Sequence, residues 1–153
     1  SQIDQIREYL LPIKFSTVTA DIKKNIITKK KAIEHLNSNG ILITFPSGEV
    51  ATSSLIFNEA NEREWKPLIG SIINKTKADI IPVRFFGKNS LFFHTMGFIN
   101  NNLRKVLFIR ELFNKKNKKF NLSIGKRITL LQKEKLSNRQ IVGKLRSIVL
   151  NIN

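Results

Sequence analysis

The residues with the clearest chemical potential lie in one short segment, residues 45–50, with the sequence Phe-Pro-Ser-Gly-Glu-Val. The Glu49 carboxylate can accept hydrogen bonds from a substrate, and Gly48 lets a ligand approach the backbone closely. Ser47 is a weak nucleophile candidate because it lacks both the Gly-x-Ser-x-Gly context and a base nearby in sequence. The segment therefore predicts a loop that binds a ligand, with an ordinary turn as the alternative interpretation.

Other side chains that often carry catalysis or metals are scarce. The chain has two histidines, His35 and His94, and no cysteine. His35 comes just before the end of an expected helix, which favours a surface or capping role. His94 lies among aromatic residues, which favours a packed position. Two isolated histidines without cysteine give no metal signature, so we predict neither a metal site nor a catalytic residue within these residues.

The elements around residues 45–50 predict how that segment is positioned. Residues 41–45 form a short β-branched apolar run, which is typical of a buried strand. Apolar residues at helical spacing predict a helix over residues 65–73, and a second strand follows at residues 80–85. A strand–loop–helix–strand unit is usually right-handed with parallel strands. Residues 47–49 and 87–90 should then lie together at one sheet edge, without a tight turn after the first strand.

The remaining patterns complete an α/β prediction. They predict a strand at residues 10–18, a helix at residues 29–38 capped by Thr28, two short helices within residues 91–113, a basic turn at residues 114–119, a strand at residues 120–124, and a capping box at Ser137–Gln140 that begins a last helix. We expect residues 1–153 to form a single domain with a mixed, largely parallel sheet flanked by helices.

The composition is strongly basic. The 153 residues include 27 Lys and Arg against 11 Asp and Glu, a net charge of +16. Such a field favours polyanions, including an anionic membrane surface, an acidic carrier or nucleic acid, although compositional bias alone also explains it. Nucleic acid is the less favoured partner because the phenylalanines lie in core-like runs. No apolar run is long enough to span a membrane, and the lack of cysteine fits a reducing compartment.

Several segments together resemble a known family. "ILITFPSGEV" (residues 41–50) resembles the third sequence block of the lysophospholipid acyltransferase superfamily, which is glycerol-phosphate acyltransferase-like, and "IIPVRFFGKNS" (residues 80–90) resembles the fourth. "EWKPLIGSIINKTKADI" and "RELFNKKNKKFNLSIGKRI" look like the branch often labelled putative hemolysin. That branch is similar to acyltransferases that O-acylate lyso-forms of ornithine or glycine lipids. The resemblance covers about residues 11–128.

The chain departs from the family pattern at two places. The commonest third block has Glu at the position of Ser47, whereas this chain has its carboxylate at Glu49, which fits a different acceptor head group. The catalytic His-x-x-x-x-Asp block of the family is absent, because Gly40 follows His35 at that spacing and Ile99 follows His94. The resemblance therefore implies the C-terminal portion of an enzyme whose catalytic block precedes Ser1, and a chain that is inactive alone.

The resemblance implies an O-acyltransferase that moves a fatty acyl group from an acyl thioester to a lyso-lipid. The donor would be acyl-CoA or acyl carrier protein, and no bound cofactor is expected. The enzyme would be cytoplasmic and peripheral on the inner membrane face, with residues 91–113 at the lipid interface or, alternatively, in a core helix pair. A basic nucleic-acid-binding module and a noncatalytic interaction domain remain the alternatives. The predicted substrate-binding residues are Phe45, Pro46, Ser47, Gly48, Glu49, Arg84 and Asn89.

Overall fold

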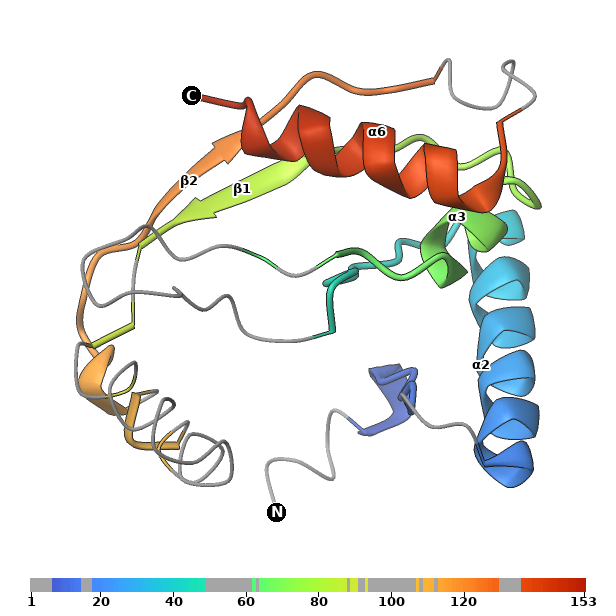
Figure 1. Cartoon of the computed structure of the whole chain (residues 1–153), viewed down its shortest axis with the longest axis horizontal. Coiled ribbons are helices and arrows are strands. Elements are labelled where there is room, and N and C mark those ends of the chain that lie inside the picture. Colours follow the sequence, from blue (N-terminus) through green and yellow to red (C-terminus); the bar gives the residue numbers. More distant parts are fainter. Residues whose placement is uncertain are drawn as a thin grey trace. The chain divides into compact units, whose positions relative to one another are not determined.

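The computed structural model describes residues 7–14, 18–48, 62, 64–87, 89–90, 93, 107, 109–111, 113–129 and 136–153 (Figure 1). These residues form helices and one pair of antiparallel strands, so the chain is mixed α/β. Its contacts divide it into two compact units. Unit 1 contains residues 1–44, 67–80 and 128–142, and unit 2 contains residues 45–66, 81–127 and 143–153.

The longest helix of unit 1 is α2 (Thr19–Asn37), which follows the short 3₁₀ helix η1 (Arg7–Tyr9). Straight-chain lysines and the lack of Gly and Pro favour a helix over this stretch. It ends where Asn39 takes a left-handed backbone conformation (φ 62°) and the Gly40 N–H donates to the His35 carbonyl (2.9 Å). His35 is exposed, in agreement with the predicted surface role, and its Nε2 donates to the carbonyl oxygen of Ile41 (3.2 Å), which lies beyond the helix end.

The prediction for the residues before α2 was wrong. The predicted strand at residues 10–18 does not form in its described part, and the helix begins at Thr19 instead of residue 29. Backbone groups of residues 12–14 form hydrogen bonds with side chains of α2 and not with a second strand. The Lys14 N–H donates to Oδ1 of Asn25 (3.0 Å), Nδ2 of Asn25 donates to the Lys14 carbonyl (2.7 Å), and the Thr28 hydroxyl donates to the Pro12 carbonyl (3.2 Å). Thr28 is therefore an interior helix residue and caps nothing.

The second helix of unit 1 is α3 (Leu68–Ile73), whose Ile72 and Ile73 are buried. It confirms the predicted amphipathic helix from Leu68 onward. Nζ of Lys29 in α2 donates to the Ser71 hydroxyl (3.0 Å) and ties the two helices together. The backbone of α3 approaches the start of α6 so closely that a Cβ on Gly70 would lie 2.2 Å from the carbonyl oxygen of Asn138.

Unit 2 contains the strand pair, β1 (Val83–Phe86) and β2 (Asn121–Ile124), in which Val83 pairs with Ile124 and Phe86 with Asn121 (Figure 1). Both predicted strands form here, but they are antiparallel, so the predicted largely parallel sheet was wrong. Residues 41–45 belong to no strand, and Ile41 and Ile43 are more than four-fifths exposed. A β-branched run has strand propensity, but a strand forms only where the fold supplies a paired backbone.

The last helix, α6 (Asn138–Leu150), begins in unit 1 and ends in unit 2. Its predicted capping box is confirmed. The Ser137 N–H donates to Oε1 of Gln140 (2.9 Å), and the Gln140 N–H donates to the Ser137 hydroxyl oxygen (3.3 Å). The predicted apolar face is buried at Ile141 and Leu145.

Most of residues 91–113, predicted to form two short helices, lie outside the described residues. Phe93, which is helical, is almost fully buried. The predicted basic turn, residues 114–119, is confirmed: residues 115–117 form a turn, and Asn117 has a left-handed φ of 61°. Within the described part of the chain, no helix is both long and apolar enough to cross a membrane.

Candidate functional site

The Phe-Pro-Ser-Gly segment is a tight turn. The Gly48 N–H donates to the Phe45 carbonyl (3.0 Å), and Gly48 has a left-handed φ of 66° that favours glycine. Pro46 suits the second position of such a turn because its ring fixes φ. The segment therefore adopts the ordinary turn that the sequence left open as an alternative, and the local turn chemistry explains it.

The surroundings of this turn combine buried and exposed groups. Ser47 is 2% exposed, whereas Phe45 is 72% exposed. The Pro46 carbonyl accepts the Lys66 N–H (3.0 Å), which brings the turn next to the buried Trp65. Among the described residues, the indole N–H of Trp65 has no hydrogen-bond acceptor. The turn therefore offers buried polar groups and an exposed ring, while Glu49 lies outside the described residues.

A second cluster in unit 2 is organised by Ser90, which follows β1. The Phe93 N–H donates to the Ser90 hydroxyl oxygen (3.2 Å), the bond that an N-cap residue accepts at the start of a helix. The Ser90 N–H donates to Oε2 of Glu111 (3.0 Å), and the Ser90 hydroxyl donates to Oε1 of the same carboxylate. Nζ of Lys115 donates to Oδ1 of Asn89. Two short segments, residues 89–90 and 111–115, are therefore joined by side-chain hydrogen bonds.

The Glu111 carboxylate is 5% exposed and ionised. Burial alone would raise the pKa of this carboxyl, since a charge is costly away from water. The two hydrogen bonds from Ser90, with the nearby charges of Lys115 and Arg110, outweigh burial and hold the pKa below its ordinary value of 4.5. Glu111 is therefore a fixed negative charge that aligns the residue 89–90 segment.

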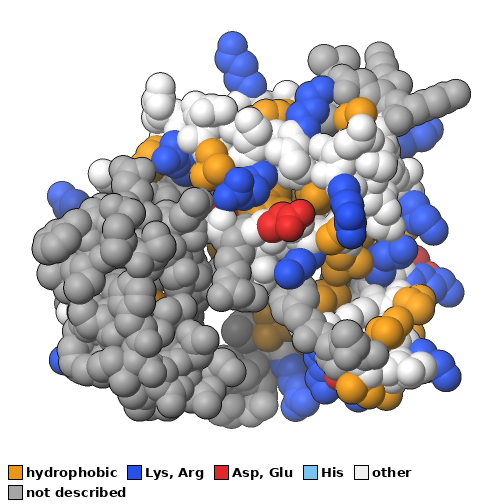
Figure 2. Space-filling view, viewed as in Figure 1, with side chains coloured by type: hydrophobic (Ala, Val, Ile, Leu, Met, Phe, Trp, Pro, Cys, Tyr) orange, Lys and Arg blue, Asp and Glu red, His pale blue; other side chains and the backbone are white. Residues whose placement is uncertain are grey.

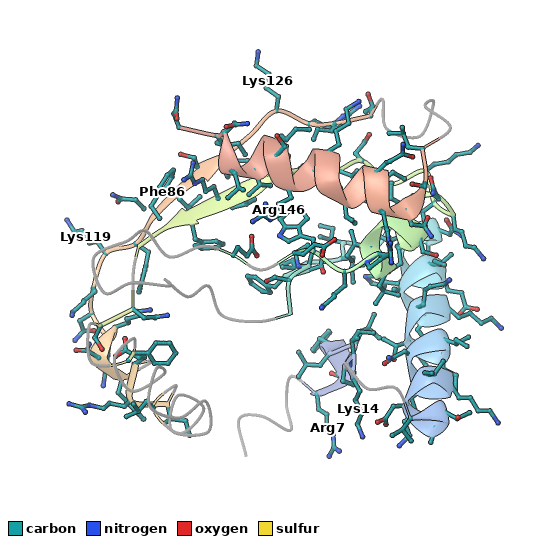
Figure 3. The ribbon with its side chains drawn as sticks, in the orientation of Figure 1. Arg7, Lys14, Phe86, Lys119, Lys126 and Arg146 are labelled. Carbon is teal, nitrogen blue, oxygen red and sulfur yellow. The ribbon has the colours of Figure 1, made fainter. Side chains whose placement is uncertain are left out.

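These segments border a cavity of about 300 Å³. Three kinds of side chain line it: polar groups from the loop after β1, three lysines around the basic turn, and two phenylalanines at the adjoining strand ends. Figure 3 shows Lys119 and Phe86 on these neighbouring segments. The lining residues are Phe86, Gly87, Asn89, Ser90, Glu111, Asn114, Lys115, Lys118, Lys119 and Phe120. We call this the lysine cavity.

The predicted site residues have different places in the structure. Asn89 lines the lysine cavity, whereas Arg84 forms hydrogen bonds at the C-terminal end of α6. Nη1 of Arg84 donates to the carbonyls of Leu150 (2.5 Å) and Ile152 (3.1 Å), and its guanidinium lies 4.8 Å from the centre of the Phe86 ring. The bond to Leu150 satisfies a carbonyl that the helix end leaves without an intrahelical partner, and Ile152 lies just beyond the helix.

The predicted site residues do not include Glu111 or the three lysines of the cavity. The signals were present: Ser90 stands just before an apolar run, where an N-cap residue is common, and the basic turn was visible as a cluster of charge. What the sequence did not show is that the two come together. The predicted basic turn contributes three lysines to the cavity lining.

No known protein family matches the chain, and no similar protein was found among curated proteins or solved structures. In the described part of the chain, no group of three or more His, Cys, Asp or Glu side chains could hold a metal ion.

The ionised Glu111 predicts pH-dependent stability. Because its pKa is lower in the folded chain, its contribution to the free energy of unfolding is present above pH 4.5 and is lost as pH falls through the folded pKa. Glu111→Gln should lower the free energy of unfolding by about 1–3 kcal/mol at pH 7. The loss should shrink as pH falls below 4.5. Urea unfolding at pH 7, 5, 4 and 3 measures both effects.

The matched control is Glu34→Gln, which removes an exposed carboxylate that pairs with Lys30 at 3.8 Å on the surface of α2. Such a pair contributes about 0.3–0.5 kcal/mol, so its loss should be small at every pH. A Glu111→Gln effect of the same size at pH 3 and pH 7 would contradict the role of the charge.

Proposed function

We propose that the chain is a portion of an O-acyltransferase that moves a fatty acyl group from an acyl thioester to a hydroxyl of a lyso-lipid. The acceptor would be a lyso-ornithine lipid, a lyso-glycine lipid or a lysophospholipid. The observation that carries the proposal is the contact between two separate segments of the resemblance. Ser90 of Gly-Lys-Asn-Ser bonds both carboxylate oxygens of Glu111 in Arg-Glu-Leu. Residues chosen only for their likeness to one family thus form one polar cluster.

The proposed reaction needs a catalytic His-x-x-x-x-Asp block and residues that bind the two substrates. The acceptor hydroxyl loses its proton to a histidine, its oxygen attacks the thioester carbonyl, the C–S bond breaks, and the thiol leaves with a proton. This chain contains no His-x-x-x-x-Asp pair. Its proposed part is binding: the Phe-Pro-Ser-Gly turn with Glu49 at the acceptor, and basic side chains for an anionic acyl carrier or acyl-CoA.

The surface supports a peripheral place on an anionic, cytoplasmic membrane face. Figure 2 shows Lys and Arg side chains beside exposed hydrophobic ones on the described part of one face. On α2, Ile22 and Ile26 are 45% and 60% exposed, and the adjoining Lys23 and Lys24 are also exposed. Exposed apolar side chains among lysines are typical of helices that lie in a membrane interface.

The test uses a longer protein that contains this chain together with a His-x-x-x-x-Asp block. We expect it to esterify one of the three lyso-lipids with acyl-CoA or acyl carrier protein as donor, measured as labelled product. Glu49→Ala should lower kcat/KM by about tenfold or more, since a charged hydrogen bond to the substrate contributes about 1.5–3 kcal/mol. Glu34→Ala, on the surface of α2, is the control. No ester from any donor–acceptor pair, with a circular dichroism spectrum of a folded protein, would refute the proposal.

A further inference from the structure

We propose that the lysine cavity binds the phosphate group of a phosphate ester. This inference rests in part on the proposed function, because the Ser90–Glu111 contact that carries that proposal also lines the cavity. Anion binding and acyl transfer are separate measurements, so either proposal can fail alone. The cavity lies beyond the residues that the resemblance singled out for substrate binding, apart from Asn89.

The charges in the cavity favour an anion. Lys115, Lys118 and Lys119 oppose the single negative charge of Glu111, which leaves an excess of two positive charges. Both Glu111 oxygens also accept hydrogen bonds from Ser90, which partly satisfies this carboxylate. No hydrogen bond or ion pair to another described residue occupies the ammonium groups of Lys118 and Lys119. They remain available to a ligand.

A turn of the backbone brings Lys115 and Lys118 close together. The Lys118 N–H donates to the Lys115 carbonyl (3.1 Å), and the left-handed Asn117 closes the turn between them. Lys115 is anchored to Oδ1 of Asn89, so the Asn89 amide N–H groups can still donate. Several donors around one position suit a phosphate, which offers several acceptor oxygens and more than one negative charge.

The size and remaining walls indicate an ester instead of a free ion. A cavity of about 300 Å³ is at the lower end of small-molecule sites and exceeds the needs of one phosphate group. Phe86 and Phe120 supply an apolar wall beside the lysines, suited to the organic part of the ligand. Two sources share this chemistry: the phosphates of coenzyme A or a phosphopantetheine group, and the phosphate of a lipid head group.

The experiment measures pyrophosphate binding to the full chain by calorimetry at fixed ionic strength. Lys118→Gln/Lys119→Gln should raise Kd on the order of tenfold, as expected for the loss of charge-assisted hydrogen bonds. Lys75→Gln/Lys126→Gln is the matched control, because it removes the same charge from exposed positions outside the cavity. Its Kd should change less than about twofold at physiological salt, where distant charges are screened. Equal weakening by both pairs would show that only net charge attracts the anion, and would overturn the proposal.

A second measurement locates the ligand and identifies its source. In amide NMR spectra, pyrophosphate should shift residues 89–90 and 115–119, and shifts confined to other residues would overturn the proposal. Coenzyme A, glycerol phosphate and pantetheine are then compared. Tighter binding of coenzyme A identifies the acyl carrier as the source, and tighter binding of glycerol phosphate identifies a lipid head group. Pantetheine, which has no phosphate, should not bind, and binding equal to coenzyme A would refute a phosphate site.

Discussion

The isolated 153-residue chain should release no thiol from acyl-CoA or acyl carrier protein above the uncatalysed rate when a lyso-lipid is supplied. In the proposed reaction a histidine oriented by an aspartate takes the proton of the acceptor hydroxyl, and neither His35 nor His94 has an aspartate at the His-x-x-x-x-Asp spacing. Removing a catalytic unit typically costs about 10⁴-fold or more in kcat. Relative to a longer protein with the His-x-x-x-x-Asp block, we expect a loss of at least about 1,000-fold. Thiol release measures it.

Two controls separate this prediction from trivial loss of activity. The isolated chain must show the circular dichroism of a folded protein. The longer protein with its block histidine replaced by Ala should fall to the rate of the isolated chain. Turnover by the isolated chain within about tenfold of the longer protein would show that the 153 residues contain their own catalytic group, and the proposed division of roles would be wrong.

Gly70→Ala should destabilise the chain, whereas Gly143→Ala should stabilise it. Both glycines lie in helices, but a Cβ at Gly70 would meet the Asn138 backbone, 2.2 Å from its carbonyl oxygen and 2.8 Å from its Cα. Rigid backbone cannot yield cheaply, so we expect a loss of about 1–3 kcal/mol in the free energy of unfolding. A Cβ at Gly143 would have no neighbouring atom within 4 Å. The greater helix propensity of alanine should therefore raise the free energy of unfolding by about 0.5–1 kcal/mol.

Urea unfolding of the two variants and the wild type measures both changes at once. Both variants gain the helix propensity of alanine, so this contribution cancels when their free energies of unfolding are subtracted. The remaining difference measures the contact of α3 with the start of α6. A Gly70→Ala variant as stable as Gly143→Ala would mean that Gly70 and Asn138 are not in close approach. Gly70→Ser offers a graded test, because its larger side chain should destabilise at least as much.

Several features that depend on neighbouring residues were visible in the sequence. The Ser137–Gln140 capping box forms as predicted, because both partners are three residues apart in one helix turn. The basic turn and the segments of β1 and β2 were found for the same reason: turn chemistry and alternation are local properties. The net charge of +16 also follows from composition alone and requires no fold.

Features that depend on distant partners were decided only by the tertiary structure. Residues 41–45 have the composition of a buried strand, yet Ile41 and Ile43 are exposed, because pairing depends on which backbones meet. The same holds for the site. Ser90 and Glu111 are 21 residues apart, and neither local pattern names the other. The sequence alone shows that lysines are frequent near residue 115. Only the packing of that turn beside Asn89 and Phe86 gathers three of them around one cavity, because a cavity consists of contacts between segments far apart in the chain.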